Sequence, residues 1–189
     1  MRWPVLILFL SLHAHAEGLK VSINGTAGGR WLEDAKVWAA HDVATLNGGG
    51  LTLGGSIDLV GQLSRLRLGG QLGVEAFEHP GGEVNVGRVG PLSPSSPSRD
   101  TVSSAMFITL SPFAGLAFGE DTFVGWLDLL ISLDVTSARI EGTRMFGVTA
   151  VPTLRVGGAF DLGGVGFELS ILGAFIGAQR VTFAMGLRL

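Results

Sequence analysis

Residues 123–136 read Phe-Val-Gly-Trp-Leu-Asp-Leu-Leu-Ile-Ser-Leu-Asp-Val-Thr, and from Leu127 onward every second side chain is apolar. Successive side chains of a β-strand point to opposite faces of a sheet, so this period of two predicts a strand with one apolar face. The other face carries Asp128, Ser132 and Asp134 beside Trp126. The same alternation recurs from about residue 51 to residues 181–189, which predicts an all-β chain.

Two settings suit sheets of this kind. In water a second layer covers the apolar face, whereas in lipid a closed barrel turns that face outward and keeps the polar face inside. Hydrophobic residues make up 47% of the 189 residues and charged residues 15%, and the mean hydropathy is +0.46. No interior stretch reaches the roughly 18 apolar residues of a membrane helix. This composition favours lipid contact through alternate residues of strands.

We predict eight antiparallel strands that close into an up-and-down transmembrane β-barrel, at about residues 19–28, 51–63, 66–78, 101–118, 123–136, 145–161, 165–177 and 181–189. Long loops are predicted at residues 29–50, 79–100 and 138–144, and they alternate with short turns. Transmembrane barrels have long external loops and short periplasmic turns. An even number of strands then puts both chain ends on the periplasmic side.

The N-terminus has the features of a secretory signal. Arg2 precedes a short apolar stretch at residues 3–12, and Ala14-His15-Ala16 fits a cleavage site. We therefore predict a signal peptide at residues 1–16, cleaved after Ala16, and one barrel domain at residues 17–189. The chain has no cysteine, which excludes disulfides and cysteine-ligated metals.

Charged residues of the predicted strands fall on the polar face. On the lipid face, a basic residue near the bilayer midplane would cost about 2–4 kcal/mol. The interior of an eight-stranded barrel is just wide enough for side chains to fill it, and charges buried there must pair. We expect Arg67, Arg155 and Arg188 to pair with acidic residues in an interior network of Asp58, Arg67, Glu75, Asp128, Asp134, Arg155, Glu168 and Arg188. The same residues could instead form the solvated face of a soluble sandwich.

The signal peptide, the alternating strands, the uneven connections and the final strand ending at Leu189 together resemble small outer-membrane β-barrel proteins of the OmpA/OmpX type. The resemblance implies a location in the cell outer membrane among lipid and lipopolysaccharide. It also implies a monomer that meets periplasmic chaperones and the barrel-assembly machinery during biogenesis. Because tyrosine is absent, aromatic girdles would be formed by Phe118, Phe123, Phe160 and Phe167 on the periplasmic side and by Trp31 and Phe146 on the external side.

The sequence offers no catalytic motif. After signal cleavage the remaining histidines are His41 and His79, and both lie in predicted loops. We therefore predict no enzymatic activity, no metal and no cofactor. The net charge of -3 argues against nucleic-acid binding. Basic residues in or near the predicted external loops could contact the phosphates of lipopolysaccharide: Arg30, Lys36, Arg88, Arg99, Arg139, Arg144 and Arg180.

The leading hypothesis is an outer-membrane barrel with a plugged polar interior. Its role would be structural in the envelope, or surface interaction through external loops 29–50 and 79–100. The sequence is also compatible with two alternative functions. One is a narrow pore or transporter that moves small or hydrophobic solutes, with a lateral opening for the latter. The other is a secreted soluble β-sandwich or a lipocalin-like binder.

Overall fold

The computed structural model describes residues 19–39, 42–77, 84–89, 100–120, 123–140, 143–162, 165–174 and 179–188. Apart from the turn at Ser64 and Arg65, all of these residues lie in strands. The strands are β1 (Leu19–Ala39), β2 (Asp42–Leu63), β3 (Leu66–Phe77), β4 (Val84–Val89), β5 (Asp100–Glu120), β6 (Phe123–Ile140), β7 (Thr143–Leu162), β8 (Val165–Ala174) and β9 (Gln179–Arg188). The predicted signal peptide, with Ala16, lies outside the described residues.

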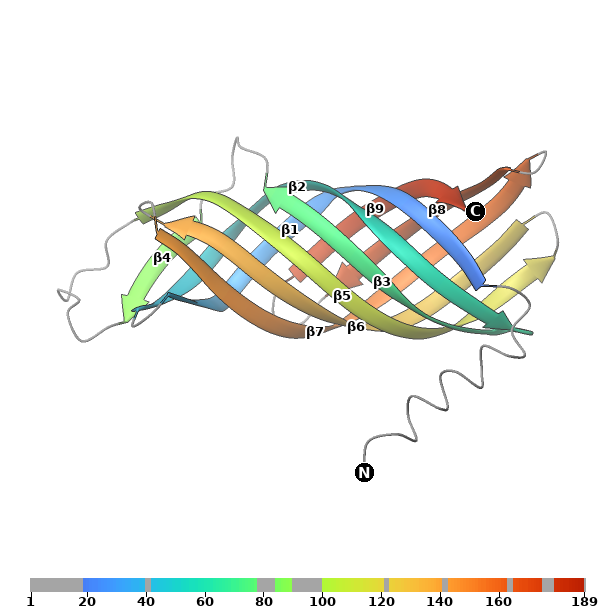
Figure 1. Cartoon of the computed structure of the whole chain (residues 1–189), viewed down its shortest axis with the longest axis horizontal. Helices are drawn as coiled ribbons and strands as arrows, with labels where there is room; N and C mark the ends of the chain where they lie inside the picture. The colour runs from blue at the N-terminus through green and yellow to red at the C-terminus, as the bar shows by residue number, and fades with distance from the viewer. Residues whose placement is uncertain are drawn as a thin grey trace, which may run out of the picture.

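Eight of the strands form one closed, antiparallel ring. The hydrogen-bonded order is β1-β9-β8-β7-β6-β5-β3-β2, and β2 pairs with β1 to complete it (Figure 1). The prediction of an eight-stranded up-and-down barrel is therefore confirmed, and the alternative of a two-layered sandwich is wrong. No helix in the described part of the chain is long and apolar enough to cross a membrane.

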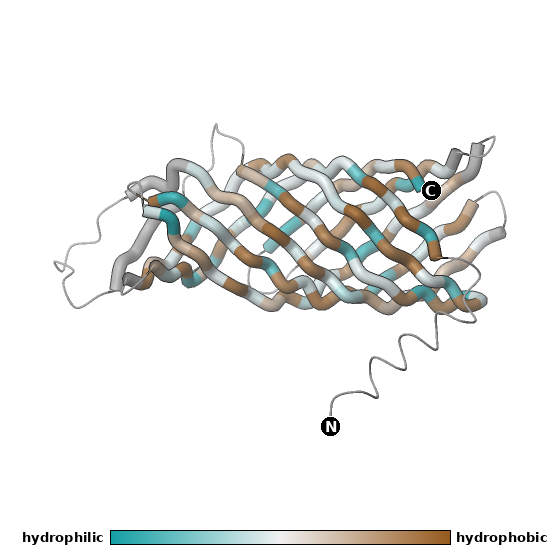
Figure 2. The backbone as a smooth tube through the Cα atoms, in the orientation of Figure 1, coloured by the Kyte–Doolittle hydropathy of each residue, from teal (hydrophilic) through white to brown (hydrophobic). Residues whose placement is uncertain are grey.

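The outer wall of the ring is apolar. Side chains alternate between exposed and buried along the strands, most regularly in β6. In a closed ring the exposed set faces outward, and here it consists of large aliphatic and aromatic side chains from every strand of the ring. The colours of Figure 2 alternate along the strands for this reason. A wall this apolar is costly in water and favourable in lipid.

The strands of one half of the barrel are longer than the sequence predicts, and the long loop predicted at residues 29–50 is wrong. β1 continues to Ala39 and β2 begins at Asp42. The loop predicted at residues 138–144 is wrong for the same reason, because β6 ends at Ile140 and β7 begins at Thr143. We call the end of the barrel that these extensions form the distal end. The proximal end is where β1 begins and β9 finishes (Figure 1).

A β-bulge in β1 explains why the alternation fades where these strands continue. The pairing of β1 with β2 shifts register between Leu32 and Ala35. Asp34 has a φ of 51°, and it donates its backbone N–H to Asn47 Oδ1 at 2.7 Å. Asn47 Nδ2 donates in return to Asp34 Oδ1 at 3.2 Å. Even-numbered residues face inward up to Leu32, and odd-numbered residues such as Val37 face inward after the bulge.

Toward the distal end, a different set of strands forms the ring. β4, which lies inside the loop predicted at residues 79–100, pairs there with β2 and with β5. Beyond the described ends of β8 and β9, β1 meets β7 at the pair Trp38 and Phe146. At this level β1, β2, β4, β5, β6 and β7 form a second, six-membered ring.

An apolar cluster fills this smaller ring, and we call it the apolar plug. Its members come from β1, β2, β5, β6, β7 and the end of β8: Leu32, Val37, Ala44, Leu46, Ala105, Phe107, Ala138, Ile140, Met145, Val151 and Ala174. All are buried, and Phe107 packs edge-on against Phe77 with ring centroids 5.3 Å apart. The interior is therefore apolar at the distal end, which the prediction of a polar interior did not anticipate.

The aromatic residues expected in the girdles all point outward: Phe118, Phe123, Phe160, Phe167, Trp31 and Phe146. Several of them cover a glycine of a neighbouring strand. A Cβ built on Gly125 would lie 2.4 Å from the Phe118 ring, and one built on Gly49 would lie 2.5 Å from the Trp31 indole. These rings lie flat against the wall because the glycines leave room for them.

We expect Gly125→Ala to destabilise the barrel by about 1–3 kcal/mol, because the new methyl group forces the Phe118 ring off the wall. The measurement is urea unfolding of the refolded protein in detergent or lipid. Gly70→Ala is the matched control, because a Cβ on Gly70 meets nothing within 4 Å. Equal stability of the two variants would show that the Phe118 contact contributes little.

Candidate functional site in the barrel interior

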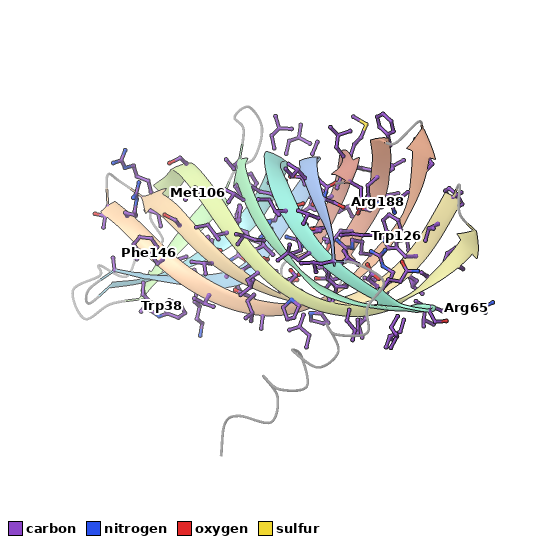
Figure 3. All side chains as sticks on the ribbon, turned by 45° about the vertical axis from the view of Figure 1, so that its right-hand side comes forward. Trp38, Arg65, Met106, Trp126, Phe146 and Arg188 are labelled. Carbon is purple, nitrogen blue, oxygen red and sulfur yellow. The ribbon has the colours of Figure 1, made fainter. Side chains whose placement is uncertain are left out.

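The strands carry most of the charged residues predicted for the interior into the lumen of the barrel. Seven of the eight are buried: Asp58, Arg67, Glu75, Asp128, Asp134, Arg155 and Glu168. The eighth, Arg188, is half-buried at the end of β9 and makes contacts of its own. Figure 3 shows Arg188 in the proximal half of the barrel, on the same side as Arg65. The buried residues form two clusters at different heights.

The proximal cluster comprises Asp58, Arg67, Asp128 and Arg155. Asp128 accepts from Arg67 Nε at 3.1 Å and from Arg155 Nη2 at 2.8 Å. Arg155 also donates through Nη1 to Asp58 at 2.6 Å. All four side chains are at most 5% exposed. Gly115 makes the approach possible, because a Cβ there would lie 2.1 Å from Asp128 Oδ1.

Glu168 lies beside this cluster but has a different partner. Its Oε2 accepts a hydrogen bond of 2.6 Å from the hydroxyl of Ser22 on β1. The contact reaches across β9, where Gly186 stands opposite Glu168. The ion pairs described for Arg67 and Arg155 go to Asp58 and Asp128, so the expected pairing of Glu168 with either of these arginines is not found.

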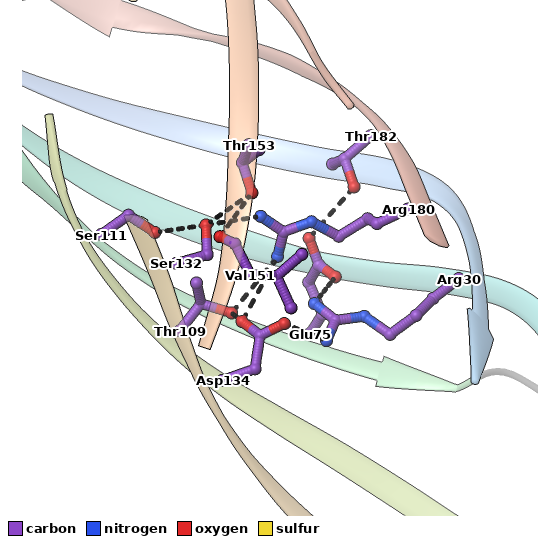
Figure 4. Close-up of polar contacts among 10 residues, drawn as sticks. All are labelled: Arg30, Glu75, Thr109, Ser111, Ser132, Asp134, Val151, Thr153, Arg180 and Thr182. Carbon is purple, nitrogen blue, oxygen red and sulfur yellow. Dashed lines mark hydrogen bonds and ion pairs between the residues drawn. The ribbon is translucent and has the colours of Figure 1, made fainter. Parts of the chain in front are cut away.

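The distal cluster comprises Arg30, Glu75, Asp134 and Arg180 (Figure 4). Arg30 donates to Asp134 at 2.8 Å and to Glu75 at 3.1 Å. Arg180, which stands directly opposite Arg30 in the β1–β9 pairing, lies 3.7 Å from Asp134. It also donates to Thr109 Oγ1 at 3.3 Å. The two carboxylates thus separate two guanidinium groups that would otherwise repel each other.

The prediction that Arg30 and Arg180 lie in or near external loops is wrong. Both are buried inside the barrel, so neither can contact lipopolysaccharide. A usable signal was present for each of them. Arg30 continues the even-numbered inward series of Ser22, Asn24 and Thr26, and Arg180 opens the inward series that Thr182 continues. The predicted first strand ends at Gly28 and the predicted last strand begins at Val181, so both arginines fall outside the predicted strands.

Three of the four interior arginines also stack on aromatic rings. The guanidinium carbon lies 4.0 Å from the ring centroid of Phe107 for Arg30, 4.3 Å from Trp126 for Arg67 and 4.5 Å from Phe113 for Arg155. A cation over an aromatic face gains electrostatic stabilisation that grows as water is excluded. These rings therefore compensate part of the cost of burying the charges.

Apolar and hydroxyl side chains fill the level between the two clusters. Leu130 and Leu172 belong to a small buried group that continues to Phe113, under Arg155, and to Val60, on the proximal side of Asp58. Beside it, Ser132 Oγ lies 2.9 Å from Ser111 Oγ and 3.0 Å from Thr153 Oγ1, so hydroxyls are bonded across β5, β6 and β7. The lumen is thus occupied along its length, from the proximal cluster to the apolar plug.

The arrangement is suited to holding the barrel wall together and offers little for chemistry. Among the described residues, no group of three or more acidic or histidine side chains could hold a metal ion. His41 and His79 lie outside these residues. Each carboxylate of the two clusters is paired with an arginine, and Asp58 Oδ1 is the one of their oxygens that is buried without a hydrogen-bond partner in the described part of the chain.

Sequence comparison finds no match: no family model and no curated protein resembles the chain. Solved structures do match. Neisserial surface protein A aligns with a TM-score of 0.56 at 12% identity, covering 92% of this chain and 99% of that one. The attachment invasion locus protein Ail of Yersinia pestis aligns with a TM-score of 0.50 at 13% identity, and a second structure of it, in complex with the heparin analogue sucrose octasulfate, with a TM-score of 0.53 at 14%. Both Ail alignments cover 92% of this chain and 99% of the other.

The chain has the fold of the small eight-stranded outer-membrane β-barrels. This agrees with the resemblance to the OmpA/OmpX type, and at such low identity the likeness concerns the fold alone. The barrel combines that fold with a buried network of polar and charged side chains in its interior.

We expect Arg155→Met to destabilise the barrel by about 3–5 kcal/mol. The reason is that the buried carboxylates of Asp58 and Asp128 each lose the ion pair with Arg155. Urea unfolding in a lipid or detergent environment measures the change. Arg144→Met is the control, because Arg144 is exposed at the distal end and should change stability by no more than about 0.5 kcal/mol. Similar values for both variants would contradict a stabilising role of the proximal cluster.

Proposed function

We propose that this protein is a non-conducting barrel of the cell outer membrane, with the proximal end toward the periplasm and the distal end toward the cell exterior. Its role is structural in the envelope or in surface contact. The observation that carries the proposal is the double closure of the lumen: two ion-paired clusters fill the wider ring, and the apolar plug fills the narrower one. A solute would have to displace both.

The alternative of a narrow pore or transporter has less support. The cavity in the interior has a volume of about 20 Å³, which is enough for about one water molecule and too small for a solute. A hydrophobic solute that entered through the wall would meet the apolar plug, whose members are at most 5% exposed. A lipocalin-like binder would need an open interior, whereas this one is occupied.

The surface that we assign to external contact is the outer side of the six-membered ring. It takes the place of the predicted loop 29–50, whose described residues belong to β1 and β2. The other predicted contact loop, residues 79–100, includes β4 and the first residue of β5, Asp100, and otherwise lies outside the described residues. Its described part, β4, belongs to the same ring.

This outer side carries basic and aromatic residues on three adjoining strands. Lys36 and Trp38 of β1, Arg144 and Phe146 of β7 and Arg139 of β6 are all exposed. Trp38 stands opposite Phe146, and Arg139 opposite Arg144. The exposed acidic residues of this part of β1 are Glu33 and Asp34, and Asp34 is bonded to Asn47.

We infer that the phosphorylated glycolipid of the outer leaflet, lipopolysaccharide, is the contact partner of this basic surface. Guanidinium groups match phosphate geometry, and their placement across neighbouring strands lets one phosphate contact two of them. Exposed tryptophan and phenylalanine side chains suit the border between hydrocarbon and headgroups. Of the basic residues expected to make this contact, Arg30 and Arg180 are excluded by burial, and Lys36, Arg139 and Arg144 remain. Arg99 and the side chain of Arg88 lie outside the described part of the structure.

The refolded protein is expected to show no steady conductance in planar lipid bilayers, because both rings are filled. Heat-modifiable migration in gels verifies beforehand that the sample is folded. A reproducible single-channel current from the folded protein would contradict the plugged interior. Recovery of the protein from the soluble periplasm, instead of from detergent-extracted outer membranes, would contradict the location.

A triple variant in which Lys36, Arg139 and Arg144 are each replaced by glutamine is expected to bind purified lipopolysaccharide at least several-fold more weakly. Its free energy of unfolding should change little. Calorimetric titration of the protein in detergent measures the affinity. Arg65→Gln is the matched control, since Arg65 is an exposed arginine at the opposite, proximal end (Figure 3). Equal loss of affinity in both variants would indicate non-specific charge attraction.

A further inference from the structure

The interior cavity lies between the two charged clusters, and most of the residues that line it are polar, with Leu172 and Ala184 among the others. Arg155 of the proximal cluster and Arg180 of the distal cluster both line it, together with Thr26, Gln71, Ser170 and Gly73. Its volume of about 20 Å³ exceeds the roughly 10–15 Å³ that one water molecule needs. Apolar cavities stay dry, whereas a polar cavity of this size binds water when two to four polar groups converge on it.

Two groups of the lining have no hydrogen-bond partner within the protein. They are the hydroxyl of Thr26 and the Nε of Arg180, on side chains at least nine-tenths buried. Other bonds along the lining are long. Gln71 Nε2 lies 3.4 Å from Ser56 Oγ, and Thr182 Oγ1 lies 3.4 Å from Glu75 Oε1. A buried donor or acceptor without a partner is costly, so these groups favour a small bonding ligand.

We propose that this cavity is a binding site for one ordered water molecule, which hydrogen-bonds to Thr26 and to the Arg180 guanidinium and joins the distal cluster to the level of Arg155. The ligand is small, neutral and able both to donate and to accept. The guanidinium N–H needs an acceptor, and the hydroxyl can either donate or accept, so one water molecule satisfies both groups. The site would thus belong to the network that holds opposite walls of the barrel together, and it does not depend on the surface role proposed above.

Gly73 offers a direct test, because its side-chain position opens on the cavity. A Cβ built there would come no closer than 3.8 Å to Gly55, Ser56 or Thr109, so alanine fits without strain. The methyl group would occupy part of the space of the water. Gly70→Ala on the outer face of the same strand is the matched control, because a Cβ there meets nothing within 4 Å.

The two possible contents of the cavity predict opposite signs. If water occupies the cavity, Gly73→Ala displaces it, leaves Thr26 and Arg180 without a partner and lowers the urea midpoint relative to Gly70→Ala. The penalty should shrink when Thr26→Val removes the hydroxyl. If the cavity is dry, the methyl group fills a void, and Gly73→Ala raises the midpoint at least as much as Gly70→Ala. That result would overturn the proposal.

A second measurement uses the wild-type protein, in case Gly73→Ala fails to fold. Nuclear Overhauser effects between water and protein in lipid nanodiscs should show a long-lived water beside Thr26 and Ser170. Their absence, with such signals present elsewhere in the barrel, would contradict the site. A midpoint that rises with chloride at constant ionic strength in the wild type, and not in Gly73→Ala, would show a small anion in the cavity and would equally overturn the proposal.

Discussion

Closure of the hydrogen-bonded sheet is the constraint on which the other features of this barrel depend. β1 pairs with β2 on one side and with β9 on the other, so the ring of eight strands has no free edge through its wider part. In lipid, each unpaired backbone group costs several kcal/mol, and closure removes that cost. Closure also fixes which side chains face inward. The alternation along each strand then sends one set to lipid and forces the other set together in a narrow lumen.

Two different kinds of side-chain packing fill the lumen along its length. In the wider ring, arginines and carboxylates from strands far apart in sequence neutralise one another, as Arg30 does with Asp134 across 104 positions. In the narrower ring, apolar side chains pack as they would in the core of a soluble protein. The distal part of the barrel therefore combines a soluble-type core with an outer side rich in charge. This division suits a part that stands outside the hydrocarbon layer.

The eight-stranded barrel and its inward charges could be predicted because a period of two is a local property of each strand. The predicted strand bounds and charge pairs are wrong where the regular local alternation breaks down. The bulge at Asp34 reverses the alternation in β1, and the stretch predicted as a loop at residues 29–50 holds Trp31, which packs against Gly49 of the next strand. Arg30 was lost with that stretch. The partners of Glu75 and Asp134 could not be found either, because the arginines that they bind had been assigned to loops.

By itself the sequence determined the strand pattern, the apolar outer face and the residue types of the inner face, because each follows from alternation over a few neighbouring positions. The tertiary structure decided the pairing of charges, the six-membered distal ring and the apolar plug. These depend on the register between strands and on the point at which each strand ends. Asp128 can receive both Arg67 and Arg155 because β5 places Gly115 between β3 and β6, and β7 adjoins β6. No local pattern encodes such a meeting.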